Sequence, residues 1–168
     1  MKGRLLRMGR TGPPVDVAAG ERVLSWATST AGVVAGTREA LYLPGPPPRR
    51  VPWEQVEAAD WDLESETLRV SEVGTWGEPR PAYDLTMTEP GRLLELVRER
   101  ITASVVLQRH VAIRGKRGVR VIARRAAAGS RELSWLFEYD EGIDPADPFV
   151  ELAAREALGA AQNEVGEN

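Results

Sequence analysis

The side chains that could do chemistry in this chain are few. Among its 168 residues there is no cysteine, and His110 is the one histidine. Without cysteine there is no thiol nucleophile and no thiolate metal site, and a single imidazole cannot supply the two or three histidines that many zinc sites use. Carboxylates are the remaining candidates for catalysis.

Acidic residues gather between positions 54 and 66, where they could provide paired carboxylates for acid–base chemistry. The group is Glu54, Glu57, Asp60, Asp62, Glu64 and Glu66. Their spacing does not bring them to one point on a bent strand and turn, so we expect most of them to face water. The sequence has no glycine-rich phosphate loop, nucleophile elbow or zinc-ligand spacing. We therefore expect a protein that is not an enzyme and that has neither a cofactor nor a metal.

A basic stretch offers binding chemistry instead. Between Arg100 and Arg131 there is no acidic residue, and the cations are Arg109, Arg114, Lys116, Arg117, Arg120, Arg124 and Arg125. The strand predicted next carries three aromatic residues, and cations beside aromatic rings can bind nucleic acid. At period two, however, Trp135, Phe137 and Tyr139 form a row facing the core, while Arg120 and Arg124 lie on an exposed face. The candidate partner-binding residues are Arg114, Lys116, Arg117, Arg120 and Arg124.

Acidic residues follow this basic stretch, at Glu138, Asp140, Glu141, Asp144 and Asp147. The separation of sign indicates an internal or intersubunit match between the acidic segment and the basic hairpin. Residues 140–144 superficially resemble a calcium loop but lack its alternating ligands and its terminal glutamate. Turn formation and helix capping explain these acids.

Composition places the chain among ordinary globular proteins, with 42% hydrophobic and 28% charged residues. Its length suits one core with an appended subdomain. No apolar run reaches the roughly 20 residues needed to span a bilayer, and the basic N-terminus lacks the apolar centre of a signal peptide. We expect a cytosolic protein that is not transmembrane. Its net charge of −3 gives no general attraction to nucleic acid.

Alternation and turn residues predict an antiparallel meander followed by a helix. Residues 1–19 are expected to form an arm. The predicted strands are 20–27, 31–36, 40–44, 50–56, 67–73 and 82–87. Thr88 is the predicted N-cap of a helix whose apolar stripe runs from Leu93 to Val105. Residues 111–113 lead into a turn at 115–118, and the strands 119–125 and 133–139 form a second hairpin. A helix then begins at Asp147–Pro148 and frays past Gly159.

Four features together resemble bacterial pleckstrin-homology-like domains of the GRAM-related type. They are Gly20–Glu21 before an apolar strand, the Thr37–Arg38–Glu39 turn that leads into residues 40–45, the segment 50–56, and the helix from Pro90. The similarity covers about residues 20–108. It implies an α+β fold in which a bent antiparallel barrel is closed by a helix, so that residues 109–168 form a C-terminal β-hairpin and helix extension. The chain also resembles an actinobacterial protein of this kind, which supplies no biochemical role.

In lipid-binding members of the wider fold, cations surround the loop of the first hairpin. Here that loop, Thr28–Ser29–Thr30, has no lysine or arginine, so phosphoinositide binding is not expected. The sequence favours a non-enzymatic protein-interaction or scaffold module that binds a protein partner or itself. The alternative is a weak nucleic-acid or anionic-surface binder that uses the hairpin 109–131.

Overall fold

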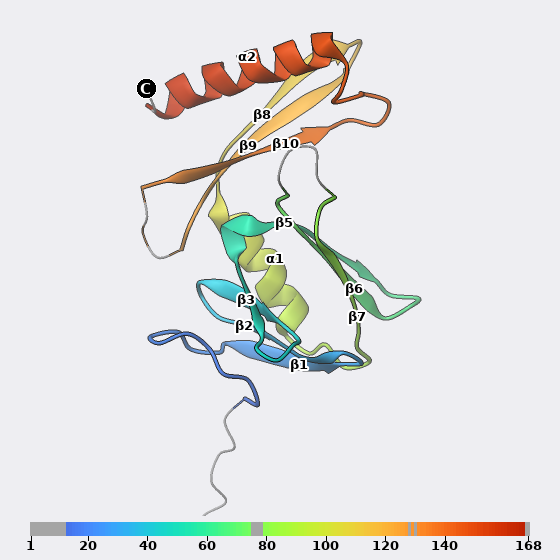
Figure 1. Ribbon diagram of the computed structural model, residues 1–168, viewed down its shortest axis with the longest axis vertical. Coiled ribbons are helices and arrows are strands. Elements are labelled where there is room, and N and C mark those ends of the chain that lie inside the picture. Colours follow the sequence, from blue (N-terminus) through green and yellow to red (C-terminus); the bar gives the residue numbers. More distant parts are fainter. Residues whose placement is uncertain (1–12, 75–78, 128, 130, 167–168) are drawn as a thin grey trace, which may run out of the picture.

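The computed structural model describes residues 13–74, 79–127, 129 and 131–166. These residues form an α+β fold of three antiparallel sheets and two α-helices. Figure 1 shows two bodies. The first two sheets and the first helix make up the N-terminal body, residues 13–104, and the third sheet and second helix make up the C-terminal body, residues 105–166.

The N-terminal body contains the predicted meander. Its first sheet has the strand order β1 (Ser25–Ser29), β2 (Gly32–Gly36), β3 (Ala40–Leu43) and β4 (Arg49–Pro52). A 3-10 turn, η1 (Trp53–Gln55), leads into the second sheet, which consists of β5 (Val56–Asp62), β6 (Thr67–Glu72) and β7 (Ala82–Thr86). Within each of these two sheets, every strand pairs with the next one along the chain, as in a meander.

Helix α1 (Leu93–Ser104) packs on both sheets and completes the first core. The helix begins at Leu93, whose N–H donates to the carbonyl oxygen of Pro90, and Arg92 at the N-cap makes no side-chain capping bond. The prediction of Thr88 as the cap was therefore wrong. The buried core takes side chains from β1 to β7 and from α1, among them Val34, Leu41, Val51, Trp53, Val56, Leu68, Val70, Leu85, Leu93 and Val97.

The predicted α+β fold is confirmed, but the predicted closed barrel is not. Strand pairing among the described residues leaves the first two sheets separate. They approach each other at one corner, where the N–H of Thr30, just after β1, donates to the carbonyl oxygen of Thr86 at the end of β7, with an N–O distance of 2.9 Å. The two sheets share one core without forming one continuous ladder.

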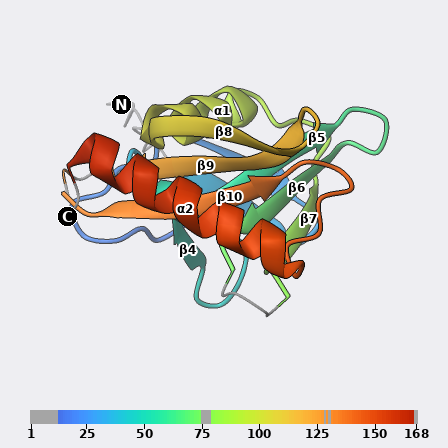
Figure 2. The same ribbon diagram turned by 90° about the horizontal axis from the view of Figure 1, so that it is seen from above.

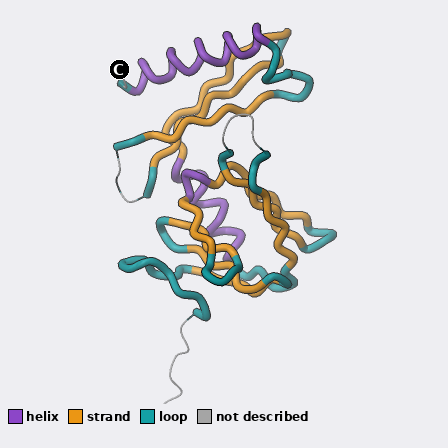
Figure 3. The backbone as a smooth tube through the Cα atoms, viewed as in Figure 1, coloured by secondary structure: helices purple, strands orange, loops and turns teal. Residues whose placement is uncertain are grey.

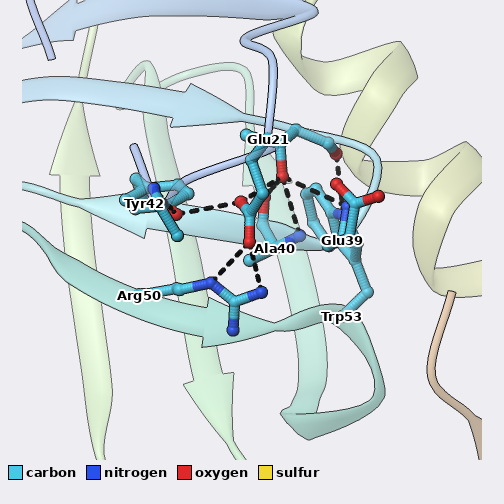
Figure 4. A network of polar contacts seen from close by, with 8 residues as sticks. Glu21, Glu39, Ala40, Tyr42, Arg50 and Trp53 are labelled. Carbon is cyan, nitrogen blue, oxygen red and sulfur yellow. Dashed lines mark hydrogen bonds and ion pairs between the residues drawn. The ribbon is translucent and has the colours of Figure 1, made fainter. Parts of the chain in front are cut away.

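A buried carboxylate fixes the segment that precedes β1. Glu21 accepts hydrogen bonds from the hydroxyls of Thr37 (2.8 Å) and Tyr42 (2.9 Å) and from Nε of Arg50 (2.7 Å), as Figure 4 shows. Val15 and Val17 pack nearby against Tyr42. The later part of the predicted arm is thus docked on the first sheet, whereas residues 1–12 lie outside the described residues.

The C-terminal body starts directly after α1, with no intervening loop (Figure 3). Its sheet has the order β10 (Leu133–Tyr139), β9 (Arg117–Arg125) and β8 (Val105–Arg114), so β8 is an edge strand. Val105, which was predicted to belong to the preceding helix, is the first residue of β8. Helix α2 (Pro148–Val165) lies across one face of this sheet (Figures 1 and 2).

The predicted aromatic row does face a core, which lies under α2. Trp135, Phe137 and Tyr139 pack with Val119, Val121 and the alanines of the helix. The predicted cap is also confirmed, since the carboxylate of Asp147 accepts a hydrogen bond from the N–H of Phe149 at 2.9 Å. The helix does not fray at Gly159 but continues to Val165.

No helix in the described part of the chain combines the length and the apolar character needed to cross a membrane.

Candidate functional site

The basic hairpin predicted from the sequence is formed by β8 and β9. A tight turn at Gly115 and Lys116 joins the strands, and Gly115 adopts the left-handed conformation with φ of 62° that glycine tolerates best. Arg114, Lys116 and Arg117 lie at this turn, Arg120 lies within β9, and Arg124 lies near the far end of β9. The five candidate residues therefore occupy three different surroundings.

Arg124 is buried, with 2% of its surface exposed, so its prediction as a surface residue was wrong. Its Nε donates to Oγ of Ser104 (2.7 Å), its Nη2 to the carbonyl oxygen of Trp53 (2.5 Å), and its Nη1 to the carbonyl oxygen of Val56. Burial lowers the pKa of this guanidinium to about 10, against the raising effect of the Glu54 charge, so that it stays protonated at neutral pH. Arg124 fastens the C-terminal body to the N-terminal body.

Arg114, Arg117 and Arg120 contact the acidic segment that follows the hairpin. The internal form of the predicted charge match is confirmed by two ion pairs, and a third arginine donates to a backbone carbonyl of the same acidic segment. The contacts are Arg114 Nη2 to Asp147 Oδ2 at 2.6 Å, Arg120 Nη1 to Glu138 Oε2 at 3.1 Å, and Arg117 Nη1 to the carbonyl oxygen of Glu141 at 3.2 Å. Lys116 makes no ion pair with any described residue.

Two further residues of β8 are also paired. Arg109 forms an ion pair with Glu164 near the end of α2. Nε2 of His110 lies 2.7 Å from Oδ2 of Asp140, and the same oxygen accepts the N–H of Gly118 at 2.7 Å. Both hydrogen bonds lower the pKa of Asp140 below its usual value of 3.8, and the bond with His110 has the larger effect. His110 thus helps to hold the end of β10 on the hairpin.

The outer edge of β8 has no partner strand among the described residues. Eight of its ten residues are exposed, and among the described residues it pairs only with β9. Val105, Val106 and Val111 present exposed apolar side chains along it. An edge strand of this length presents unpaired N–H and C=O groups, which are a template for another strand.

An exposed aromatic side chain lies near one end of this edge. Phe149 is 62% exposed and follows Asp147 by two residues, and Asp147 contacts Arg114 at the end of β8. Leu152, one turn further along α2, is also exposed. The edge of β8 and the start of α2 therefore bring apolar surface to the same part of the C-terminal body.

The acidic residues at 54–66 do not converge on one point. Asp62 accepts hydrogen bonds from the N–H of Glu64 and the hydroxyl of Ser65 in the turn before β6, while Glu57 forms an ion pair with Arg80. Within the described ranges, no group of three or more acidic, histidine or cysteine residues is arranged to hold a metal ion.

Sequence reasoning missed one grouping of arginines. Arg38, Arg100 and Arg125 line a common cavity although they come from the β2–β3 turn, α1 and the end of β9. No local spacing links three residues so far apart in the chain, so only the packing of the two bodies reveals that they are neighbours.

Comparisons with protein-family models, with curated proteins and with solved structures find no match to this chain.

Proposed function

We propose that this chain is a cytosolic, non-enzymatic protein-interaction module that associates with itself by pairing β8 of one copy with β8 of another. The observation that carries the proposal is the exposed ten-residue edge strand with its valines. Antiparallel pairing about a two-fold axis would extend the sheet across the interface and satisfy the free backbone groups of both edges.

The ion pairs of the hairpin support this proposal. An antiparallel pair of two copies brings the residues near the two-fold axis close to their own counterparts, and like charges facing each other destabilise a sheet. On β8 the cationic groups are Arg109 and Arg114, and each has an acidic partner from its own chain, while His110 contacts Asp140. Two such strands can therefore approach without an accumulation of unmatched positive charge.

Light scattering coupled to size-exclusion chromatography tests the proposal over a wide range of protein concentration. We expect the mass of the wild-type chain to rise from 18.4 kDa toward twice that value as concentration increases. Val111→Lys should shift this rise to higher concentration, because a lysine on the edge opposes pairing. Leu63→Lys is the matched control, since Leu63 is 79% exposed on the β5–β6 turn, away from β8. A wild-type chain that stays monomeric throughout contradicts self-association.

We propose further that the N-terminal body is a PH-like domain of the GRAM-related type. Its support is the order of a four-stranded sheet, a three-stranded sheet and a helix, together with the Thr30–Thr86 hydrogen bond at the corner of the two sheets. The β1–β2 turn carries no cation, so we do not extend the proposal to phosphoinositide binding.

The alternative function, binding of nucleic acid or an anionic surface by the hairpin, has weaker support. Phosphate groups compete poorly for guanidiniums that already have carboxylate partners, and burial removes Arg124 from the surface.

A further inference from the structure

A cavity of about 310 Å³ lies where the two bodies meet. Its cationic wall consists of Arg38 from the β2–β3 turn, Arg100 from α1 and Arg125 from the end of β9. Trp53, Ser104 and several alanines complete the lining, and none of the described lining residues is acidic. Three arginines thus line one half-open cavity, and Glu99, the ion-pair partner of Arg100, is not among the residues that line it.

The hydrogen-bond donors of these arginines are largely unused. Arg38 and Arg125 make no hydrogen bond or ion pair with any other described residue. Arg100 forms an ion pair with Glu99 through Nη2, while its Nε is buried and has no partner among the described residues. A guanidinium offers five N–H donors, so most of the donor capacity around the cavity is free. This differs from the basic hairpin, where the acidic segment occupies the arginines.

A fourth arginine adds positive charge behind the cavity wall. The buried guanidinium of Arg124 donates to Ser104, which lines the cavity, and its other two acceptors are neutral carbonyl oxygens. Arg124 forms no ion pair within 4 Å with a described residue, although the charge of Glu54 lies close enough to raise its pKa. Charges interact more strongly when protein shields them from water, so this arrangement favours an anion in the cavity.

We infer that this cavity binds a small molecule through a phosphate or diphosphate group. Guanidiniums bind the oxygens of phosphate in a forked geometry, and three of them from different elements can contact different oxygens of one group. The volume is at the lower end of the range of roughly 300–1,000 Å³ for small-molecule sites, which favours a compact phosphate ester over a dinucleotide. The apolar wall from Ala103, Val106 and Ala126 suits a short carbon skeleton. The site is separate from the interface proposed for β8 and does not depend on it.

Isothermal titration calorimetry of the full chain with inorganic pyrophosphate at low ionic strength tests the inference. We expect saturable binding at one site per chain, and about tenfold or greater weakening in the Arg38→Gln/Arg125→Gln double variant. Both side chains are exposed and free of described partners, so the variant should keep its fold, which far-ultraviolet circular dichroism can verify.

The matched control is Arg22→Gln/Arg98→Gln, which removes the same charge from exposed positions outside the cavity. It should bind pyrophosphate within about twofold of the wild-type chain if the effect is local. Absence of saturable binding to the wild-type chain, or equal weakening in both double variants, overturns the site. Citrate binding as tight as that of pyrophosphate overturns the preference for phosphate.

Discussion

Nε of Arg124 lies 2.7 Å from Oγ of Ser104, so that a buried arginine of the third sheet is joined to the last residue of α1. The same guanidinium reaches the carbonyl oxygens of Trp53 and Val56 at the point where the first sheet gives way to the second. A further hydrogen bond, from Gln55 Nε2 to Ser134 Oγ at 3.1 Å, joins β10 to this region. These contacts hold the two bodies together.

Replacement of Arg124 should therefore weaken the whole fold. In Arg124→Met, two carbonyl oxygens and a hydroxyl lose their donor, and we expect the free energy of unfolding to fall by roughly 2–4 kcal/mol. Arg120→Met is the control on the same strand, since its ion pair with Glu138 is exposed and contributes at most about 1 kcal/mol. Urea denaturation measures both. A similar small loss in the two variants contradicts the joining role of Arg124.

The contrast between these two arginines shows what sequence patterns leave undetermined. Strand alternation correctly places Arg120 and Arg124 on the same face of β9, opposite the aromatic core under α2. It does not reveal that the N-terminal body covers one end of that face. Trp53 and Val56, whose carbonyl oxygens accept hydrogen bonds from Arg124, lie about 70 positions earlier in the chain. The local sequence pattern of β9 therefore cannot predict this contact.

Features set by local chemistry were predictable. The strands of the meander follow from alternation and turn residues, and Asp147 before Pro148 identifies the start of α2. The Gly20–Glu21 pair stands out in the sequence before an apolar strand, but the role of Glu21 depends on tertiary structure, where it accepts hydrogen bonds from Tyr42 and Arg50. The cationic cavity depends wholly on such long-range packing.

Stability should depend on pH through Glu21. Burial disfavours its charge, but hydrogen bonds from Arg50, Thr37 and Tyr42 outweigh burial and lower its pKa below the usual 4.5. A carboxyl group with a lowered pKa in the folded state stabilises above its unfolded pKa, and this contribution is lost as pH falls through the folded value.

The Glu21→Gln variant checks this dependence. At pH 7 we expect it to be less stable than the wild-type chain by about 1–2 kcal/mol, because the amide replaces a carboxylate in a charged network. The difference should shrink well below pH 4.5, where Glu21 itself becomes protonated. Denaturant titrations at several pH values measure it, and a difference that does not vary with pH contradicts the assignment.

Gly159 offers a stabilising change. It lies inside α2, and a Cβ added there meets no atom within 4 Å. Glycine lowers helix stability by about 1 kcal/mol relative to alanine in a helix interior. We expect Gly159→Ala to raise the free energy of unfolding by about 0.5–1 kcal/mol in thermal or urea denaturation. A neutral result indicates that the helix is not continuous through this position in solution.

Gly118 should respond in the opposite way. A Cβ at this position would lie 1.8 Å from the carbonyl oxygen of Val111 and 2.8 Å from Cα of Ala112, and both are backbone atoms. Because the backbone of β8 cannot yield as a side chain can, Gly118→Ala should destabilise the protein by about 1–3 kcal/mol or more. Hydrogen exchange should locate the loss in β8 and β9, and an unchanged stability contradicts the close approach of these strands.

Release of the paired hairpin arginines should create affinity for polyanions. Glu138→Gln/Glu164→Gln removes the carboxylate partners of Arg120 and Arg109. We expect the double variant to bind single-stranded DNA more tightly than the wild-type chain at low salt, with a dependence on salt that is steeper by about 0.7 per freed cation that contacts a phosphate. Fluorescence anisotropy across a salt series measures both quantities.

The control for this effect, Glu64→Gln/Glu89→Gln, changes the net charge equally at exposed sites in the N-terminal body. If it tightens DNA binding as much as Glu138→Gln/Glu164→Gln does, net charge rather than the ion pairs governs the interaction. Strong, salt-dependent binding by the wild-type chain itself would instead favour nucleic-acid recognition over the protein-interaction role, since it requires cations on the hairpin that phosphate can reach despite their partners.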